Sequence, residues 1–261
     1  MKIACVQMDV LLARPAENFA KAEALVTEAA KDGADVIVLP ETWNIGFFPR
    51  EGLTSLADPD GKQVKRCFGA LAAELNVNLI AGSAATVRSG SIYNTAYVFN
   101  RAGECVASYD KTHLFSPMGE NEFFTPGDKV CTFSLDGVSC GLILCYDIRF
   151  PELTRTLALR GMEILFVPAQ WPAVRIEHWR TLTRARAIEN QIFLACCNGC
   201  GTAGETVYGG NSAIYDPWGE VLAAADSEET VIRAECDLGI IDGIRRSIHV
   251  FADRRPEIYH Y

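Results

Sequence analysis

The chain has 261 residues, of which 49% are hydrophobic and 22% are charged. This ordinary globular composition excludes disordered and fibrous proteins, and the net charge of −9 argues against nucleic acid or an anionic membrane as the main partner. No stretch reaches the roughly 18 consecutive apolar residues of a membrane-spanning helix, and the N-terminal MKIACVQMDV has the pattern of a strand rather than of an export signal. We therefore expect a cytoplasmic protein whose ten cysteines stay reduced.

The first half of the sequence alternates buried strands with amphipathic helices. The helices carry apolar residues every three or four positions, whereas the strands are short continuous apolar runs. The tetrapeptide NRAG at 100–103 is a turn signal between two further strands. In chain order the pattern predicts a strand at 3–7, a helix at 15–31, a strand at 35–40, a helix at 62–76, a strand at 79–84 and a hairpin with arms at 92–99 and 104–109.

The second half of the sequence repeats this order of elements. Pro151 and Gly161 mark the two ends of its first helix, and DPWG at 216–219 is a second hairpin turn. The similarity between the halves has two interpretations, an internal repeat or chance. The pattern predicts a strand at 139–144, a helix at 152–160, a strand at 164–168, a helix at 177–190, a strand at 192–197 and hairpin arms at 212–215 and 221–225.

Buried strands that alternate with helices, together with hairpins, indicate a mixed α/β sheet protein. No linker rich in proline, glycine or serine divides the sequence, and the glycine-rich stretch 199–210 is short enough to be a loop at a site. We therefore predict a single α/β domain that spans residues 1–261.

Three predicted strands end in residues that suit a nucleophilic site. Glu41 follows the strand at 35–40, Lys111 follows the hairpin arm at 104–109, and Cys145 follows the strand at 139–144. Loops at strand ends line the crevice of an open α/β protein. There a carboxylate can remove the thiol proton, and an ammonium can stabilise charge on sulfur or on an oxyanion. Taken singly, each residue has a simpler interpretation, as a surface carboxylate, a solvated lysine or a core cysteine.

Together with their flanks, these residues resemble the nitrilase superfamily of carbon–nitrogen hydrolases. The similarity covers essentially the whole chain, and the combination of blocks around the glutamate, the lysine and the cysteine is specific, whereas a lone Cys-Tyr-Asp is not. The resembling stretches are VLPETWNIGF (38–47), YDKTHLF (109–115), ILCYDIRFPE (143–152), VPAQWP (167–172), HWRTLTRARAIENQ (178–191) and YDPWGEVLA (215–223).

The resemblance implies a four-layer α-β-β-α sandwich that assembles into a homodimer or larger homo-oligomer. It also implies a thiol hydrolase without a metal or other cofactor, acting on a small amide. In that mechanism Glu41 is the general base for Cys145, while Lys111 and the backbone N–H of Tyr146 hold the oxyanion. Ammonia leaves, a thioester remains, and water activated by the same glutamate releases the acid.

The family also has a second glutamate on the loop after the lysine. Counting back from TPGD at 125–128, we match it to Glu120, with Glu122 as the alternative. The resemblance implies that this carboxylate positions Lys111 and the substrate amide.

Other chemistry-bearing residues have competing interpretations. His113 or His178 could form a Cys–His dyad, but the glutamate and the lysine already supply that chemistry. The flanks of Cys145 also lack the glycines that permit the strained turn of a Gly-x-Cys-x-Gly elbow. The C-x-x-C at 197–200 has no second pair for zinc and no helix behind it for redox chemistry, so structural thiols are the expectation, with redox sensitivity and metal binding as alternatives.

The substrate is suggested by the stretches AQWP and HWRTLTRARAIENQ, which look most like the omega-amidase-type branch. Those enzymes hydrolyse the terminal amide of alpha-keto acid amides such as 2-oxoglutaramate. The far carboxylate of such a substrate calls for an arginine, and Arg175 and Arg149 are the candidates. Arg149 has a second interpretation, an ion pair with Asp147 that orients the nucleophile turn.

Several alternatives remain open at the level of sequence. A hydrolase of N-carbamoyl amines or amino acids, an amidase for deaminated glutathione and a nitrilase would share the same three residues. From other classes come a metal hydrolase and a non-catalytic binding protein with the same fold. The binding protein would lack Glu41, Lys111 or Cys145, and all three are present.

Overall fold

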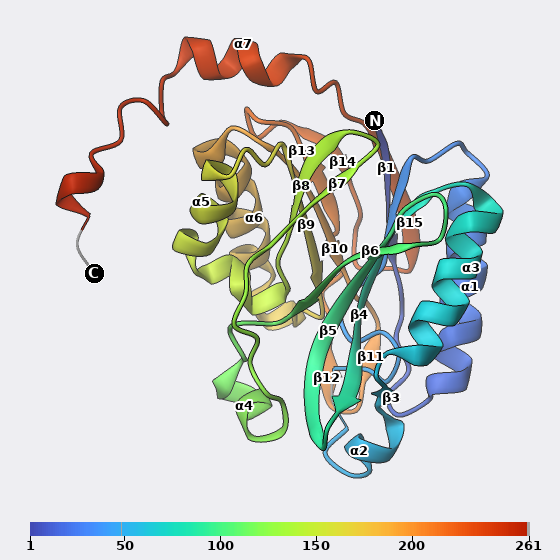
Figure 1. The fold of residues 1–261 in the computed structure, drawn as a ribbon. Coiled ribbons are helices and arrows are strands. Elements are labelled where there is room, and N and C mark those ends of the chain that lie inside the picture. Colours follow the sequence, from blue (N-terminus) through green and yellow to red (C-terminus); the bar gives the residue numbers. More distant parts are fainter. Residues whose placement is uncertain (48, 260–261) are drawn as a thin grey trace.

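The computed structural model describes residues 1–47 and 49–259. Within these residues the strands form two large mixed sheets and one small two-stranded sheet. The large sheets lie face to face and helices cover their outer faces (Figure 1). The predicted four-layer α-β-β-α sandwich is confirmed.

The first large sheet and its two covering helices come from the first half of the chain and one late strand. They comprise β1 (Lys2–Gln7), α1 (Pro15–Ala30), β2 (Val36–Val38), β3 (Asp58–Pro59), α3 (Lys62–Leu75), β4 (Asn78–Arg88), β5 (Ser91–Phe99), β6 (Cys105–Asp110) and β15 (Thr230–Glu235). The strand order is β15-β1-β2-β4-β5-β6, with β3 beside β4. Strands β1, β2 and β4 run parallel, whereas β15, β5 and β6 pair antiparallel with their neighbours.

The second large sheet and its helices come next in the chain. They comprise β7 (Cys131–Leu135), β8 (Val138–Leu142), α5 (Pro151–Leu159), β9 (Ile164–Ala169), α6 (Ile176–Asn190), β10 (Phe193–Asn198), β13 (Ala213–Tyr215) and β14 (Val221–Ala224). The strand order is β14-β13-β10-β9-β8-β7. Strands β8, β9 and β10 run parallel, and the outer strands pair antiparallel.

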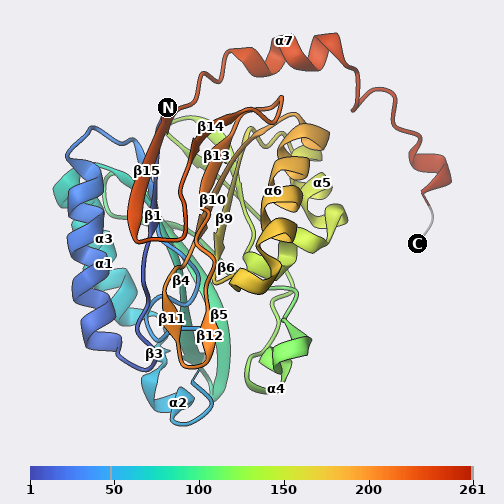
Figure 2. The same ribbon diagram turned by 180° about the vertical axis from the view of Figure 1, so that it is seen from behind.

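The remaining elements are short and lie in loops or near the C-terminus. They are α2 (Leu53–Leu56), α4 (Glu120–Phe123), β11 (Thr202–Ala203), β12 (Thr206–Val207), α7 (Ile240–Ser247) and 3₁₀ turns at Ser116–Met118, Cys145–Arg149, Ala173–Arg175 and Pro256–Ile258. Helix α7 packs against the core through Ile241 and Ile244, and the described chain beyond it extends to one side of the molecule, as the views from opposite sides show (Figures 1 and 2). No helix among the described residues is long and apolar enough to cross a membrane.

The core has three layers of apolar side chains. The central layer lies between the two sheets and includes Val38 from the first and Phe166 from the second. Phe68 of α3 packs on the outer face of the first sheet, and Trp179 of α6 packs on the outer face of the second. Because strands β1, β2, β8, β9 and β10 are covered on both faces, they read as continuous apolar runs in the sequence.

The two large sheets have the same topology, which favours a repeat over chance as the interpretation of the similar halves. In each sheet three parallel strands with helical crossovers are followed by two antiparallel strands. At the opposite edge of each sheet, one more antiparallel strand pairs with the first parallel strand. This edge strand is β15 in the first sheet and β7 in the second. The last strand of the chain therefore completes the unit that the first strand begins.

Most predicted elements are present, with ends shifted by a few residues. The strand predicted at 79–84 extends to Arg88 as β4, and the strand predicted at 139–144 ends at Leu142. Strands β7 and β15 and helix α7 lie outside the predicted set. A signal for β7 was present in Asp136-Gly137, whose positive φ angles of 50° and 83° form the tight turn to β8. Gly243 inside α7 weakens the helical pattern there.

Candidate active site

Chain segments from both sheets meet where the predicted residues lie. Glu41 follows β2, Lys111 follows β6 and Cys145 follows β8. The backbone N–H of Glu41 donates to the carbonyl of Ala169 at the end of β9 (3.3 Å). The backbone N–H of Gln170 donates in return to Glu41 Oε2 (2.9 Å). These two hydrogen bonds join the sheets at the site and fix the direction of the Glu41 carboxylate.

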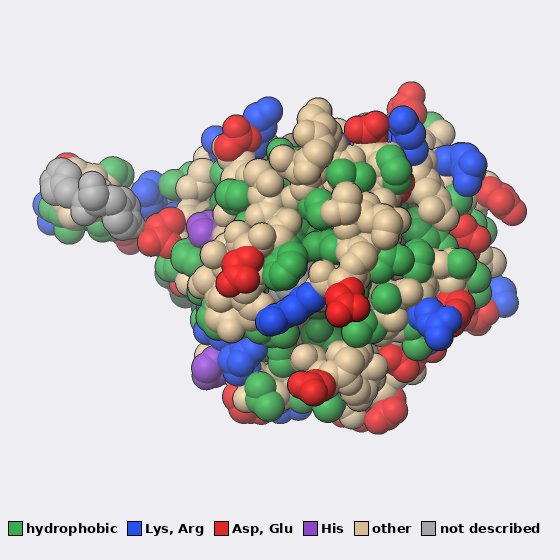
Figure 3. All heavy atoms as spheres, turned by 90° about the horizontal axis from the view of Figure 1, so that it is seen from below, with side chains coloured by type: hydrophobic (Ala, Val, Ile, Leu, Met, Phe, Trp, Pro, Cys, Tyr) green, Lys and Arg blue, Asp and Glu red, His purple; other side chains and the backbone are tan. Residues whose placement is uncertain are grey.

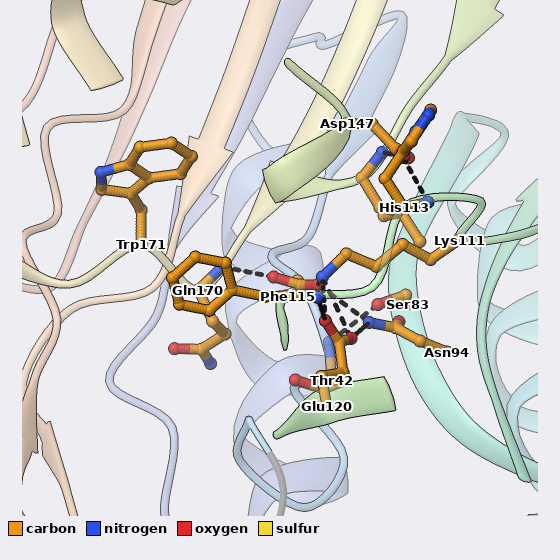
Figure 4. Close-up of polar contacts among 12 residues, drawn as sticks. Thr42, Ser83, Asn94, Lys111, His113, Phe115, Glu120, Asp147, Gln170 and Trp171 are labelled. Carbon is orange, nitrogen blue, oxygen red and sulfur yellow. Dashed lines mark hydrogen bonds and ion pairs between the residues drawn. The ribbon is translucent and has the colours of Figure 1, made fainter. Parts of the chain in front are cut away.

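The centre of the site is a buried cluster around the Lys111 ammonium. Its Nζ donates to Glu41 Oε1 at 2.7 Å and to Glu120 Oε1 and Oε2 at 3.0 and 2.9 Å (Figure 4). All three side chains have an exposed fraction of 0%. Burial works against the charged ammonium, but the carboxylates of Glu120 and Glu41 outweigh it and hold the pKa of Lys111 well above its ordinary value.

Glu120 is anchored by three kinds of donor. Besides Lys111, it accepts hydrogen bonds from the backbone N–H of Phe115 (2.6 Å) and from Asn94 Nδ2 (3.2 Å). Burial raises the pKa of Glu120; the negative charge of Glu41 adds to this, while Lys111 acts in the opposite direction. Glu122, the alternative match for the second glutamate, is exposed. The structure thus brings Glu120, and not Glu122, to the lysine.

Cys145 is held in a strained backbone conformation. It begins the 3₁₀ turn after β8 with φ of +45°, a region that non-glycine residues rarely occupy outside functional turns. A strained turn, termed the elbow below, therefore forms at Cys145, although its flanks lack the glycines of a Gly-x-Cys-x-Gly sequence. Burial raises the pKa of the Cys145 thiol well above its ordinary value and Glu41 raises it further, against the effect of Lys111.

Asp147 holds the elbow from behind. Its carboxylate accepts from the backbone N–H of Leu144 (2.9 Å) and of His113 (3.0 Å), and from the hydroxyls of Tyr109 (2.8 Å) and Thr112 (3.1 Å). His113 Nδ1 also lies 2.8 Å from Asp147 Oδ1. Asp147 thus has the structural role considered for it, but through partners other than Arg149.

A cavity of about 300 Å³, including its open mouth, has Cys145 in its wall. Arg149 and Arg175, both proposed from sequence, line it too. The Arg149 guanidinium lies over the Trp171 ring (4.7 Å to the centroid) and 3.2 Å from His178 Nδ1. Burial lowers the pKa of Arg149, and the nearby charge of Arg175 adds to the effect. Among the described residues, the lining is Phe47, Phe115, Met118, Cys145, Tyr146, Arg149, Gln170, Trp171, Pro172 and Arg175.

The mouth of the site lies among the loops at one end of the sheets. Viewed from below, this end carries hydrophobic side chains near its centre and scattered charged side chains around them (Figure 3). Arg175 lies over the Phe115 ring at 5.1 Å from its centroid. Such a cavity suits a small molecule with an apolar middle and a negatively charged end.

The remaining candidates lie apart from the nucleophile. His113 binds Asp147 and stacks on Phe150 (3.7 Å between ring centroids). Cys197 lies between the sheets, where its thiol donates to the carbonyls of Val6 (3.1 Å) and Val38 (3.2 Å). Among the described residues no group of histidine, cysteine or acidic side chains has the arrangement of a metal site.

Sequence reasoning missed two polar residues of the site. Asn94 Nδ2 donates to both Glu41 (2.8 Å) and Glu120 (3.2 Å). Gln170 lines the cavity and orients Glu41 through its backbone. Asn94 lies within the predicted strand at 92–99, and a polar side chain in such an apolar strand was the available signal. Gln170 directly follows the buried strand β9. A position at the end of a buried strand was the same signal that pointed to Glu41, Lys111 and Cys145.

Comparisons with known proteins agree with this geometry. Residues 2–246 match the carbon-nitrogen hydrolase family. The 2-oxoglutaramate amidase of Bacillus subtilis (strain 168) is 41% identical over 98% of this chain and 98% of its own length. The omega-amidase NIT2 of Bos taurus is 33% identical over 99% of this chain and 96% of its own length.

Solved structures show the same fold. A mutant of the amidase from Nesterenkonia sp. AN1 superposes with a TM-score of 0.87 at 26% identity, covering 99% of this chain and 95% of that one. In that structure the acetamide moiety of fluoroacetamide is covalently attached to the active site cysteine.

Proposed function

This chain belongs to the carbon–nitrogen hydrolase family, and we propose that within it the protein is an omega-amidase that hydrolyses the terminal amide of alpha-keto acid amides such as 2-oxoglutaramate. The observation that carries the proposal is the buried Glu41–Lys111–Glu120 cluster beside Cys145, in one cavity with two arginines. The names of the relatives from Bacillus subtilis and Bos taurus support the choice of substrate.

In the first half of the reaction Cys145 forms a thioester. The raised pKa of the Cys145 thiol means that sulfur carries its proton until a base removes it, so Glu41 takes this proton as sulfur attacks the amide carbonyl. The carbonyl π-bond becomes an oxyanion, which the Lys111 ammonium and the backbone N–H of Tyr146 stabilise. Collapse of the adduct breaks the C–N bond, and Glu41 returns the proton to the nitrogen, which leaves as ammonia.

In the second half water replaces ammonia. Glu41 accepts a proton from water as the oxygen attacks the thioester carbonyl, and the same donors stabilise the second oxyanion. The C–S bond then breaks, the proton returns to Cys145 and the carboxylic acid leaves. Glu120 holds Lys111 with two hydrogen bonds, so the ammonium keeps its position and its charge through both halves.

The far end of the substrate is assigned to the arginines. Arg149 and Arg175 line the cavity, and among the described residues no carboxylate lies within ion-pair distance of either. A carboxylate between them relieves their mutual repulsion and gains charge-assisted hydrogen bonds. Changing both to alanine raises KM for 2-oxoglutaramate and leaves turnover of an uncharged amide; an unchanged KM contradicts this assignment.

The test of the proposed function is ammonia release from a panel of amides. The panel comprises 2-oxoglutaramate, 2-oxosuccinamate, an N-carbamoyl amino acid, deaminated glutathione and a simple nitrile, with Cys145→Ala as the blank. We expect turnover of the two keto-acid amides alone, its loss in Cys145→Ala, inactivation by iodoacetamide and no effect of a chelator. Release from the carbamoyl compound, the glutathione derivative or the nitrile instead contradicts the substrate, and sensitivity to chelator contradicts the thiol mechanism.

We also infer a cytoplasmic homo-oligomer. All ten cysteines are free, which suits a reducing compartment. Leu159 of α5 and Ile188 of α6 have exposed fractions of 46% and 45%. Such apolar side chains on one helical layer support association between copies of the chain. Sedimentation equilibrium at micromolar concentration gives the mass, and a monomer contradicts the inference.

A further inference from the structure

Gln170 has a buried side-chain amide without a partner. The residue has an exposed fraction of 2%, yet neither Oε1 nor Nε2 has a hydrogen-bond partner among the described residues. Burying an amide in this way is unfavourable unless a ligand or water completes its hydrogen bonds. The position of Gln170 in the cavity wall with Cys145, Arg149 and Arg175 makes a ligand a suitable partner.

The backbone around Gln170 fixes where its amide lies. The backbone N–H of Gln170 donates to the Glu41 carboxylate, so a shift of this backbone would move the proposed base. The Gln170 side chain points away from the Lys111 cluster, and no dashed line reaches its amide (Figure 4). On the other side lies Gly199, where a Cβ would come within 2.5 Å of Gln170 Oε1. Because glycine has no side chain, position 199 leaves room for the Gln170 amide.

A neutral amide suits a different part of the substrate from an arginine. The arginines attract the carboxylate at one end, and Cys145 attacks the carbonyl at the other. Between these ends an alpha-keto acid amide carries a neutral oxo group, which is a hydrogen-bond acceptor. Gln170 lines the same cavity, and its side-chain amide carries a neutral N–H donor.

We propose that Gln170 is a specificity-determining residue whose side-chain amide donates a hydrogen bond to the 2-oxo group of the substrate. This inference rests on the proposed function, because the oxo group belongs to the substrate assigned there. A site built to bind such a group discriminates against the analogue that lacks it.

The test is a cycle that varies the residue and the oxo group together. Gln170→Met keeps the length of the side chain but removes its polar atoms. kcat/KM is measured for 2-oxoglutaramate and for glutaramate, which differs only by lacking the oxo group. Any ring closure of the keto compound in solution is the same for both proteins, so it cancels from the comparison. We expect wild type to prefer the oxo compound and Gln170→Met to lose about tenfold of that preference.

Gly199→Ala is a second variant that does not alter Gln170 itself. The three atoms nearest to the new methyl group all belong to the end of the Gln170 side chain, so the substitution should displace the amide while the backbone is kept. We expect the same loss of preference for the oxo compound, and no further loss when Gly199→Ala is added to Gln170→Met. Thermal melting checks that each variant is folded.

The outcomes separate this inference from the proposed function. If wild type releases ammonia from neither keto-acid amide, the proposed function is wrong. Dissociation constants of 2-oxoglutaramate and glutaramate for Cys145→Ala, with and without Gln170→Met, then still test the contact without turnover. If either cycle shows equal losses for both amides, Gln170 acts on Glu41 or on packing, and the inference is wrong. An unchanged ratio of kcat/KM between 2-oxoglutaramate and glutaramate also overturns the inference.

Discussion

At the scale of single residues, the site depends on keeping two carboxylates beside one ammonium. Glu41 and Glu120 both accept from Lys111, and two like charges this close repel each other. Asn94 is a neutral donor to both of them. The backbone carbonyl of Asn94 also accepts from the backbone N–H of Lys111 (2.9 Å), so one residue of β5 positions all three members of the cluster.

Asn94→Ala should therefore change the pH dependence of the reaction. Burial already raises the pKa of Glu120, and loss of a hydrogen bond to the charged form raises it further. Since a protonated Glu120 holds Lys111 less well, the acid limb of kcat/KM should move to higher pH. At neutral pH we expect kcat/KM to fall about tenfold. Ammonia release across the pH range measures both effects.

Asn78→Ala is the matched control for this prediction. Asn78 has an exposed fraction of 1%, and its amide binds the Asp35 carbonyl and the Asp136 carboxylate rather than the cluster. This variant should lower the melting temperature and leave the acid limb in place. An Asn94→Ala enzyme with the wild-type pH profile would show that Asn94 serves packing alone.

At the scale of elements, a bulge in β4 shapes the loop that carries Glu41. The pairing of β4 with β5 shifts register between Ile80 and Ser83, and Gly82 lies inside this shift with φ of +56°. A Cβ there would meet the Pro40 carbonyl at 1.9 Å. The backbone N–H of the neighbouring Ser83 donates to the same Pro40 carbonyl (3.1 Å). Strand β4 thus fixes the backbone after β2 and the direction of Glu41.

Gly82→Ala should therefore reduce stability and activity together. The clash and the positive φ should lower the free energy of unfolding by about 2–4 kcal/mol and displace the Glu41 loop. Gly90→Ala is the control, because Gly90 has φ of +83° and open space around its Cα. It should cost only about 1 kcal/mol and keep full turnover. Urea unfolding and ammonia release test the pair, and equal effects at both positions would refute the argument.

Elements were predictable where one local pattern decides them. The hairpin signals at 100–103 and 216–219 are both confirmed, because a tight turn between apolar arms leaves little choice of pairing. The hydrophobic period located α1, α3, α5 and α6. The hydrophobic period did not locate β15, because this edge strand lacks a regular alternation of buried and exposed residues. Its pairing with β1 also joins opposite ends of the chain.

At the scale of the whole molecule, the two sheets bury many thiols. Burial raises the pKa of Cys131, Cys140, Cys200 and Cys236 to about 12. Their ordinary value is 9.0. Above pH 9 the unfolded chain therefore loses protons that the folded chain retains. The stability present below that pH is lost as pH rises toward the folded values.

We therefore expect the free energy of unfolding to fall as pH rises above about 9, by up to about 1.4 kcal/mol per pH unit for each thiol. Urea unfolding between about pH 8 and pH 10.5 measures the slope, and a single transition is expected for one domain. Cys140→Ala should make the decline less steep by one thiol. Cys67→Ala, on a partly exposed face of α3, is the control, and a stability that does not change with pH contradicts the prediction.

The sequence by itself determined most of the elements, the mixed α/β class and the candidate residues at three strand ends, whereas the four-layer sandwich was implied by the family resemblance. Those features depend on local periodicity and on the residue types that come directly after an apolar run, so they can be read without knowing contacts. Glu41, Lys111 and Cys145 were expected to meet for this reason. Lys111 does bind Glu41, and the charges of Glu41 and Lys111 are close enough to act on the pKa of the Cys145 thiol. The role of each in catalysis stays a prediction.

Only the tertiary structure decided how the site is completed. Asn94 and Gln170 come from β5 and from the residue after β9, so their relation to Glu41 depends on the packing of two sheets. The choice of Glu120 over Glu122 depends on which carboxylate is buried, and the strained elbow depends on Asp147 behind it. Most of these contacts join residues far apart in sequence, and none of them follows from the local apolar patterns that located the elements.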